Sequence, residues 1–492
     1  MDLTGLETIL DQIGSIVWGP FLLIPLLLGT GVYLTFRLGG IQFIRLGAAL
    51  RLGLLKRSDD TEEGDISQFQ ALTTAMAATV GTGNIVGVAT ALAVGGPGAL
   101  FWMWVTALVG MATKYSEAFL AVRFRVNDAA GEKSGGPQYY LQRGIPNGFG
   151  KLLALSFAIF ATIACFGIGN LTQGNAIATN LENSFSIPLW ISGVVLTAMT
   201  FIVLVGGIKS IGRVTATLVP VMVIFYVLSA LFILGVNISM VPAAFGQIFG
   251  QAFTGTSAVG GFLGSSLIIA VQFGVARGLF SNESGLGSAP IAAASAQTNH
   301  PVRQGLVSMT QTFIDTIIVV SCTGLVIITT GAWNEIDPAT GEQISAGLMT
   351  ASAFSHGLPG VWGHWVVTVG LLLFAYSTIL GWAYYGERNI ERLFGRGGVM
   401  PFRVFFSLVV YVGCTTRLGI VWSLSDVMNG LMALPNLIGL LLLSGLIARE
   451  TRLYLKHDPK LEATREEIEA FMDHDPGWEE WKKNERTAVH NP

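Results

Sequence analysis

Charged side chains are scarce in this sequence of 492 residues: only 12% of the residues are charged, whereas 51% are hydrophobic. A soluble chain of this length would carry about twice that share of charge. The mean hydropathy of +0.60 and repeated apolar runs of about 20 residues, each able to cross a hydrocarbon core of about 30 Å, indicate an integral membrane protein. The net charge of −3 therefore says little about partners.

Cysteine pairs, histidine clusters and nucleotide-binding loops are also missing. The three cysteines, Cys165, Cys322 and Cys414, lie in apolar segments without paired or metal-ligand spacing, and we interpret them as packing residues. None of the six histidines has a sequence partner at metal-binding or catalytic spacing. The lack of a P-loop argues against ATP-driven transport. No combination of nucleophile and base suggests an intramembrane enzyme, and we expect neither an organic cofactor nor a nucleic acid partner.

The first residues, MDLTGLETILDQIGSIVW, contain neither a basic segment nor a small-residue cleavage site. We therefore expect a short amphipathic segment at the N-terminus, followed by a first membrane span that is not removed by cleavage. Together with that span, hydropathy predicts eleven membrane helices. They cover approximately residues 16–36, 67–94, 99–123, 152–180, 187–206, 213–236, 261–295, 303–331, 361–385, 402–417 and 422–448.

Lysine and arginine in the connecting loops give the predicted orientation, because these residues favour the cytoplasmic side. If the loop from Arg37 to Arg57 is inside, every basic residue falls inside except Arg277, within a span, and Arg417, outside. Lys114 is assigned to the inside loops in this scheme. The pattern predicts a multi-pass protein of the cell (inner) membrane, with the N-terminus outside and the C-terminus in the cytoplasm.

Ten spans remain after the first, and two halves of five enter the membrane from opposite sides. This is an inverted repeat, as in many secondary transporters, where the opening helix of each half is broken near the midplane. The predicted units are an extra helix in residues 1–40, repeats in residues 66–236 and 260–449, and a cytoplasmic tail in residues 450–492 with a short helix around 462–473.

The opening helices of both halves contain the least helical stretches of the chain, TVGTGNIVG from Thr79 and FGVARGLFSNESGLGSAP in residues 273–290. Irregular backbone at membrane depth is tolerated where it is buried in protein or lines a cavity. The free carbonyls of a broken helix suit a cation, and its free amides suit a carboxylate. A sodium ion would fit the free carbonyls, and the carboxylate of an amino acid would fit the free amides. Asn84 offers an oxygen for the cation and an NH2 for the carboxylate.

Other interpretations of these stretches exist. Gly83 and Gly87 form a GxxxG pattern, which also serves close helix packing, although two matching breaks favour binding. Arg277 and Glu283 flank the second break, and Asp315 lies in the eighth span. Charges inside a membrane are costly and usually kept for a reason. Our hypothesis is that Arg277 pairs with a carboxylate to hold the broken helix or a gate; the alternative is a structural ion pair without a part in transport.

Three blocks are similar to those of a known family. GGPGALFWMWVTALVGMATKYSE, residues 95–117, resembles the signature of the sodium:alanine/glycine symporters, and GGPQYYLQRG and NESGLGSAPIAAASAQTNHPVRQGLVSM resemble further blocks of this family. The resemblance covers nearly the whole chain. It implies an all-α integral membrane protein with about 11 transmembrane helices, arranged as a leucine-transporter-like 5+5 inverted repeat after one extra helix. It also implies uptake of alanine or glycine driven by a cation gradient.

Residue by residue, the resemblance implies a substrate site formed by both breaks and two further helices. Its residues are Thr82, Gly83, Asn84, Ile85, Gly87, Gln173, Gly278, Phe280, Thr378 and Trp382. Thr378 and Trp382 lie one helical turn apart and share a face. By analogy with the leucine-transporter fold, the carbonyls of Ala77 and Val80 and the hydroxyls of Ser377 and Thr378 would hold sodium.

The expected substrate is small, because Phe280 and Trp382 are bulky and the break itself is glycine; either aromatic residue could instead belong to the packed core. One methylene is worth only about 1–3 kcal/mol, so alanine of either hand and glycine all fit. The first break has no acidic side chain, which favours sodium over a proton, although Glu283 or Asp315 could titrate. A proton-coupled symporter, a channel and a non-transporting nutrient sensor remain alternatives.

Overall fold

The computed structural model describes residues 3–482 apart from residues 20, 57–62, 255–262, 338–340, 417–418, 474–477 and 480. Arg57 and Arg417, which entered the orientation argument, lie outside the described residues, as does the end of the tail. The described chain is helical, and its one sheet is a hairpin of β1 (Val126–Asn127) and β2 (Lys133–Ser134). The prediction of an all-α fold is thereby confirmed.

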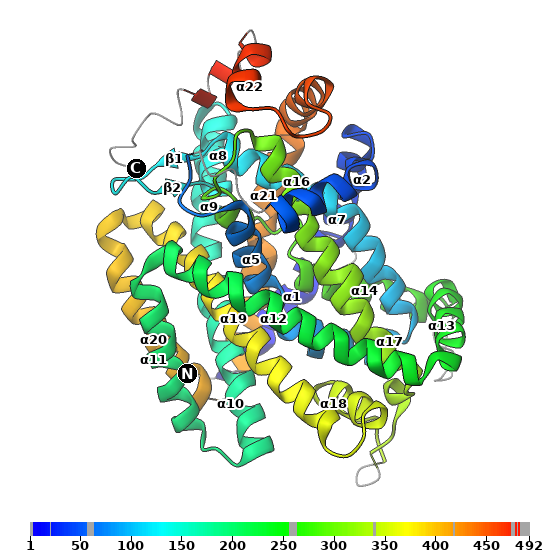
Figure 1. The fold of residues 1–492 in the computed structure, drawn as a ribbon. Coiled ribbons are helices and arrows are strands. Elements are labelled where there is room, and N and C mark those ends of the chain that lie inside the picture. Colours follow the sequence, from blue (N-terminus) through cyan, green and yellow to red (C-terminus); the bar gives the residue numbers. More distant parts are fainter. Residues whose placement is uncertain are drawn as a thin grey trace.

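The helices gather into one bundle, with the hairpin, α8 and α22 at one end and α18 at the other (Figure 1). Helices up to residue 236 are α1 (Leu3–Val17), α2 (Leu23–Arg37), α3 (Ile41–Ile44), α4 (Leu46–Leu50), η1 (Arg51–Lys56), α5 (Gln68–Thr79), η2 (Gly83–Gly87), α6 (Val88–Gly95), α7 (Gly98–Arg123), α8 (Pro137–Gly144), α9 (Asn147–Phe166), η3 (Gly167–Leu171), α10 (Thr172–Phe185), α11 (Leu189–Val205) and α12 (Gly207–Val236).

The helices after residue 236 are η4 (Ile238–Met240), α13 (Val241–Thr254), α14 (Leu263–Asn282), α15 (Pro290–Ala293), α16 (Pro301–Thr312), η5 (Phe313–Val320), α17 (Ser321–Thr329), η6 (Ala332–Asn334), α18 (Ala346–Gly357), α19 (Trp362–Phe394), η7 (Arg396–Gly398), α20 (Val399–Thr415), α21 (Gly419–His457) and α22 (Arg465–Met472). The tail helix predicted around 462–473 is confirmed by α22. It begins at a capping box, in which the Thr464 hydroxyl accepts from the Glu467 amide and the Glu467 carboxylate accepts from the Thr464 amide.

Six helices of the described chain are long and apolar enough to cross a membrane, and a seventh is formed if a bent pair counts as one span. The six are Asn147–Phe185, Gly207–Val236, Pro301–Thr329, Trp362–Phe394, Arg396–Thr415 and Ser423–His457, and the bent pair is Gln68–Thr79 with Gly83–Gly95. Leu23–Arg37, Leu189–Val205 and Leu267–Asn282 are shorter apolar helices. Large apolar side chains are exposed along α11, α12 and α20, for example Ile202, Leu228 and Phe405. The protein is therefore a multi-pass membrane protein.

Three details differ from the sequence prediction. The helix of the first predicted span, α2, begins at Leu23 and not near residue 16, and the segment before it forms the separate helix α1. The helices α13 and α18 were not predicted, since each is short and falls between apolar runs. Lys114 is not a loop residue: it lies inside α7 and is fully buried. Its assignment to an inside loop was wrong because the charge of one residue does not reveal whether it has a buried partner.

Three spans contain π-helical turns, which occur often at functional sites. They are η2 after the bend, η3 between α9 and α10, and η5 between α16 and α17. Asn84 lies in η2, Asp315 in η5, and Gln173 directly after η3. The irregular turns thus carry polar residues predicted or suspected from the sequence, and η2 packs against η5.

Candidate functional site

The first break lies between α5 and η2, whose axes differ in direction by 54°. The side chain of Asn84 closes this turn, since its Oδ1 accepts a hydrogen bond from the Gly81 amide at 2.9 Å. Glycine is required at position 81, because a Cβ there would lie 2.5 Å from Oγ1 of Thr378. The backbone of the break therefore touches α19 directly.

The predicted sodium ligands come together at the end of α5. The Ala77 carbonyl accepts hydrogen bonds from Oγ of Ser377 at 3.2 Å and from Oγ1 of Thr378 at 3.1 Å. Val80 follows as the buried C-cap of α5. Because both hydroxyls can rotate and present their lone pairs, this group of oxygens is suited to a cation. No cluster of three or more His, Cys, Asp or Glu residues that could hold a metal ion exists among the described residues.

The second break comprises the seven residues between α14 and α15. Its backbone is left-handed at Glu283, Gly285 and Gly287, where φ is 54°, 93° and 84°, a conformation that glycine adopts at least cost. The carboxylate of Glu283 accepts from Nε1 of Trp382 at 3.0 Å and from Oγ of Ser288 at 2.5 Å. Trp382, predicted as a wall of the substrate site, is thus bonded to the second break.

Asp315 links the two breaks. One of its carboxylate oxygens accepts from Nδ2 of Asn84 at 2.7 Å, and the other accepts from the hydroxyls of Ser281 at 2.8 Å and Thr316 at 2.7 Å. The side chain is fully buried, and within the described residues it forms no ion pair. Burial of a carboxyl group among neutral donors is expensive unless it binds a cation or takes up a proton. Asp315 is therefore a candidate ion-binding group.

Most predicted substrate residues lie around these breaks. Nε2 of Gln173 donates to Oγ1 of Thr82 at 3.3 Å, while its buried Oε1 has no hydrogen-bond partner among the described residues. A Cβ on Gly83 would lie 3.2 Å from the ring of Phe280. The structure brings these four residues together with Asn84, Thr378 and Trp382.

Three predicted residues are placed differently. A Cβ on Gly278 would lie 2.5 Å from Oγ1 of Thr106 on α7, so close helix packing accounts for this glycine. Ile85 is buried, and its carbonyl accepts from Oγ1 of Thr350 on α18 at 3.0 Å. A Cβ on Gly87 would have no described atom within 4 Å, so the GxxxG packing alternative applies to Gly83 but not to Gly87.

Arg277 was expected to pair with a carboxylate. Among the described residues it forms no ion pair at contact distance, but its charge acts on Asp426, which lines the same cavity. Its guanidinium carbon lies 5.9 Å from the centre of the Phe280 ring. Both side chains line a cavity of about 210 Å³ that also includes Asp11 and Asp426. Phe280 therefore separates this cavity from the first break, which it contacts at Gly83.

The second break is held by buried polar residues of α7 and α21 that were not predicted from the sequence. Lys114 and Glu117, three residues apart on α7, form a fully buried ion pair of 3.8 Å. Lys114 donates to the carbonyl of Glu283 at 2.9 Å, and Glu117 accepts from the Gly287 amide at 3.0 Å. Asn436 of α21 donates to the carbonyl of Gly285 at 2.8 Å and to Glu117 at 2.7 Å. The signal available in the sequence was two charges one turn apart within an apolar helix.

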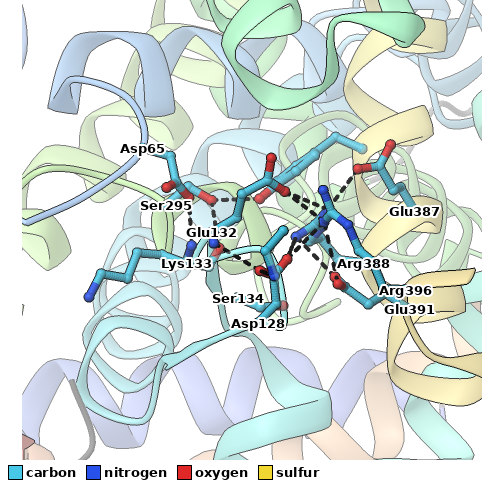
Figure 2. A network of polar contacts seen from close by, with 12 residues as sticks. Asp65, Asp128, Glu132, Lys133, Ser134, Ser295, Glu387, Arg388, Glu391 and Arg396 are labelled. Atoms are coloured by element: carbon cyan, nitrogen blue, oxygen red, sulfur yellow. Dashed lines mark hydrogen bonds and ion pairs between the residues drawn. The ribbon is translucent and has the colours of Figure 1, made fainter. Parts of the chain in front are cut away.

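A second polar network closes the hairpin end of the bundle (Figure 2). Arg388 of α19 pairs with Asp128 and Glu132 of the hairpin, each at 3.2 Å, and Arg396 pairs with the same two carboxylates at 2.8 and 2.7 Å. Burial raises the pKa of Glu132, but the hydrogen bond from Arg396 and the charges of Arg388 and Arg396 outweigh burial, so the pKa is below its usual value. The hairpin is thus fastened to α19.

The same end joins the two broken helices. Ile66, just before α5, and Ala296, just after α15, form an isolated parallel β-bridge. The Asp65 amide donates to the Ser295 carbonyl at 2.9 Å, and the Gln297 amide donates to the Ile66 carbonyl at 2.8 Å. The Lys133 amide donates to the Asp65 carboxylate at 2.7 Å. Burial raises the pKa of Asp65 to about 6, although this hydrogen bond acts in the opposite direction.

Comparison with known proteins identifies the family. The model of the sodium:alanine symporter family matches residues 3–468. This chain belongs to that family. Among curated members, the sodium/alanine symporter AgcS of Methanococcus maripaludis is 51% identical over 450 residues, covering 91% of this chain and 97% of the relative. The probable sodium/glutamine symporter GlnT of Bacillus subtilis is 36% identical, covering 90% and 89%. As a member of this family, the protein is a secondary transporter.

Among solved structures, MhsT in complex with L-phenylalanine matches with a TM-score of 0.54 at 14% identity, covering 85% of this chain and 95% of MhsT. At this level the likeness concerns the fold alone. The family member therefore has the helical transporter fold to which MhsT belongs, and the roles of single residues in the family member must be argued from its own geometry.

Proposed function

We propose that this protein couples the uptake of small neutral amino acids, alanine and glycine, to sodium entry across the cell membrane. The observation that carries the proposal is the meeting of two helix breaks around Asn84, Asp315 and Ser281 in a member of the sodium:alanine symporter family. Breaks of this kind bind substrate and coupling ion in transporters with inverted repeats. We assign the repeats to residues 66–236 and 260–449, with the N-terminus outside and the hairpin end in the cytoplasm.

The substrate fits where the buried polar groups still lack a partner. The free Oε1 of Gln173 can accept from the ammonium group of an amino acid. Phe280 against Gly83, and Trp382 held by Glu283, leave space for a small side chain. These contacts support alanine and glycine over larger substrates.

Sodium as the coupling ion is supported by the carbonyl of Ala77 and the hydroxyls of Ser377 and Thr378, whose oxygens are already within 3.2 Å of the carbonyl oxygen. Proton coupling is the second candidate, because Asp315 is a buried carboxyl group whose described partners are all neutral. Under sodium coupling, the Asp315 carboxylate stays ionised and attracts the cation; under proton coupling, it carries the proton itself.

The test is uptake of labelled alanine into proteoliposomes under an inward sodium gradient, a matched potassium gradient or an imposed proton gradient. We expect accumulation with sodium alone, and at least about 100-fold less uptake for Asn84→Ala, because this change removes the acceptor of the Gly81 amide and the donor to one of the two carboxylate oxygens of Asp315. Uptake under the proton gradient alone, abolished in Asp315→Asn, would support the second candidate. No alanine flux under any gradient would contradict both.

A further inference from the structure

Two cavities at the hairpin end of the bundle meet at the side chain of Arg392, near the end of α19. One, of about 160 Å³, lies between the hairpin, α8 and α19 and includes Tyr139 and Gln142. The other, of about 210 Å³, lies between α9 and α19. Both are lined by Arg392 and are separate from the helix breaks. Charged and polar side chains line most of the first cavity, and apolar side chains line most of the second.

The apolar cavity faces the membrane. Its lining on α9 consists of Ala154, Leu155 and Ala158, and Leu155 is 50% exposed. Ala158 lies 11 residues after the start of α9 at Asn147, or about 16 Å along the helix axis. Counted from residue 152, where the predicted membrane span begins, Ala158 lies about 9 Å along the helix, a depth at which the groove accommodates part of an acyl chain in a hydrocarbon core of about 30 Å.

The polar cavity holds a cation without an acidic partner. Arg392 donates to Oε1 of Gln142 and lies over the ring of Tyr139, but it forms no ion pair in the part of the chain that the structure describes. The nearby carboxylates are already engaged: Asp128 and Glu391 lie 2.8 and 3.4 Å from Arg396. A guanidinium whose contact partners are neutral, and whose neighbouring carboxylates pair with another arginine, is suited to bind an anion.

A second cation lies one helical turn before the groove on α9. Lys151 is exposed at the beginning of α9. It precedes Ala154 and Leu155 by three and four residues, so it lies on the same face of the helix as the groove. Lys151 and Arg392 therefore flank the position at which an acyl chain would leave the membrane core.

We propose that a phospholipid with an anionic headgroup binds here, with its phosphate between Arg392 and Lys151 and one acyl chain along Ala154 and Ala158. Basic pockets between membrane helices at the cytoplasmic side bind such headgroups, and this is the end that we assign to the cytoplasm. The site depends on the membrane fold and not on which amino acid is transported.

The test is native mass spectrometry of the full-length protein released from micelles containing equal amounts of phosphatidylglycerol and phosphatidylcholine with matched chains. We expect selective retention of phosphatidylglycerol by the wild-type protein. Arg392→Gln and Lys151→Gln should each lower this retention by about 5-fold, the effect of one basic residue near an anionic surface. Arg452→Gln, an exposed basic residue of α21 at the same end, is the matched control and should retain the lipid.

A further variant separates the acyl chain from the headgroup. Ala154→Leu fills the groove without changing charge, and it should also lower phosphatidylglycerol retention. Equal retention of both lipids, the same loss for Arg452→Gln as for Arg392→Gln, or displacement of the lipid by excess inorganic phosphate would overturn the proposal, the last by identifying a site for a soluble anion. Variants that unfold are recognised by their elution profile, and the two charge variants at different helices then decide the question independently.

Discussion

The two helix breaks differ in how they are held. The first spans the three residues from Val80 to Thr82 and is closed by its own neighbour, Asn84. The second spans seven residues and is bonded to α7, α19 and α21 through Lys114, Trp382 and Asn436. The first break thus keeps backbone and side-chain oxygens near Ala77 available for an ion. The second break is instead held in place by hydrogen bonds from three other helices. The two breaks are therefore not equivalent in structure.

The largest effect is expected when the buried ion pair of Lys114 and Glu117, which is bonded to the second break, is disrupted. Lys114→Met leaves Glu117 as an uncompensated buried charge, a change that costs about 3–5 kcal/mol, and we expect a large loss of folded protein. The measurement is thermal stability by fluorescence-detected size-exclusion chromatography. The double variant Lys114→Met/Glu117→Gln should recover part of the loss. If the loss of thermal stability in the double variant equalled the sum of the losses in the two single variants, Lys114 and Glu117 would not act as a unit.

Crowding of the first break should abolish transport with little loss of stability. In Gly81→Ala, the new Cβ meets Oγ1 of Thr378 at 2.5 Å, which displaces the hydroxyl from the Ala77 carbonyl. We expect alanine uptake to fall by more than about 10-fold, equivalent to 1.4 kcal/mol. Gly235→Ala is the control, because no atom lies within 4 Å of that Cβ position. Normal uptake by Gly81→Ala would show that this contact is not needed for transport.

The link between the substrate wall and the second break can be tested with a single hydrogen bond. Trp382→Phe keeps an aromatic ring but removes the N–H that Glu283 accepts at 3.0 Å. The loss of a buried partner is worth about 1–3 kcal/mol, and we expect a roughly 10-fold lower kcat/KM for alanine. Trp102→Phe removes a similar 2.9 Å bond, to the carbonyl of Ala252 on α13, which belongs to neither break, and should leave alanine uptake unchanged. Equal effects of both changes would contradict a specific role of Trp382.

The smallest effect concerns the bridge that joins the two broken helices. The folded pKa of Asp65 is raised from 3.8 to about 6, so the folded state favours the neutral acid. This contribution is complete below about pH 4 and is lost as the pH rises through 6, with a cost of up to about 3 kcal/mol above it. Asp65→Asn copies the neutral form. It should raise Tm at pH 7.5 and show a much smaller difference at pH 4.5; the same difference at both pH values would refute the assignment.

The sequence was informative about the breaks because glycine, proline and asparagine disturb a helix wherever they stand. It also indicated Asn84, Gln173 and Trp382, which the structure places together, although their roles remain predictions. The sequence did not reveal which residues a buried charged side chain contacts. Whether a buried charge is paired depends on residues far along the chain, and for this reason the contacts of Lys114 and Asn436 with the second break were not predicted. The short helices α13 and α18 have no apolar run of their own to reveal them.

The backbone bridge between Ile66 and Ala296 has a mechanical consequence. It fastens the leading end of one broken helix to the trailing end of the other through main-chain hydrogen bonds, which substitutions other than proline leave in place. A movement of the first break toward this end must then carry the second break with it. On the proposed function, ion and amino acid would leave together, and a leak of one without the other would require this backbone bridge to break first.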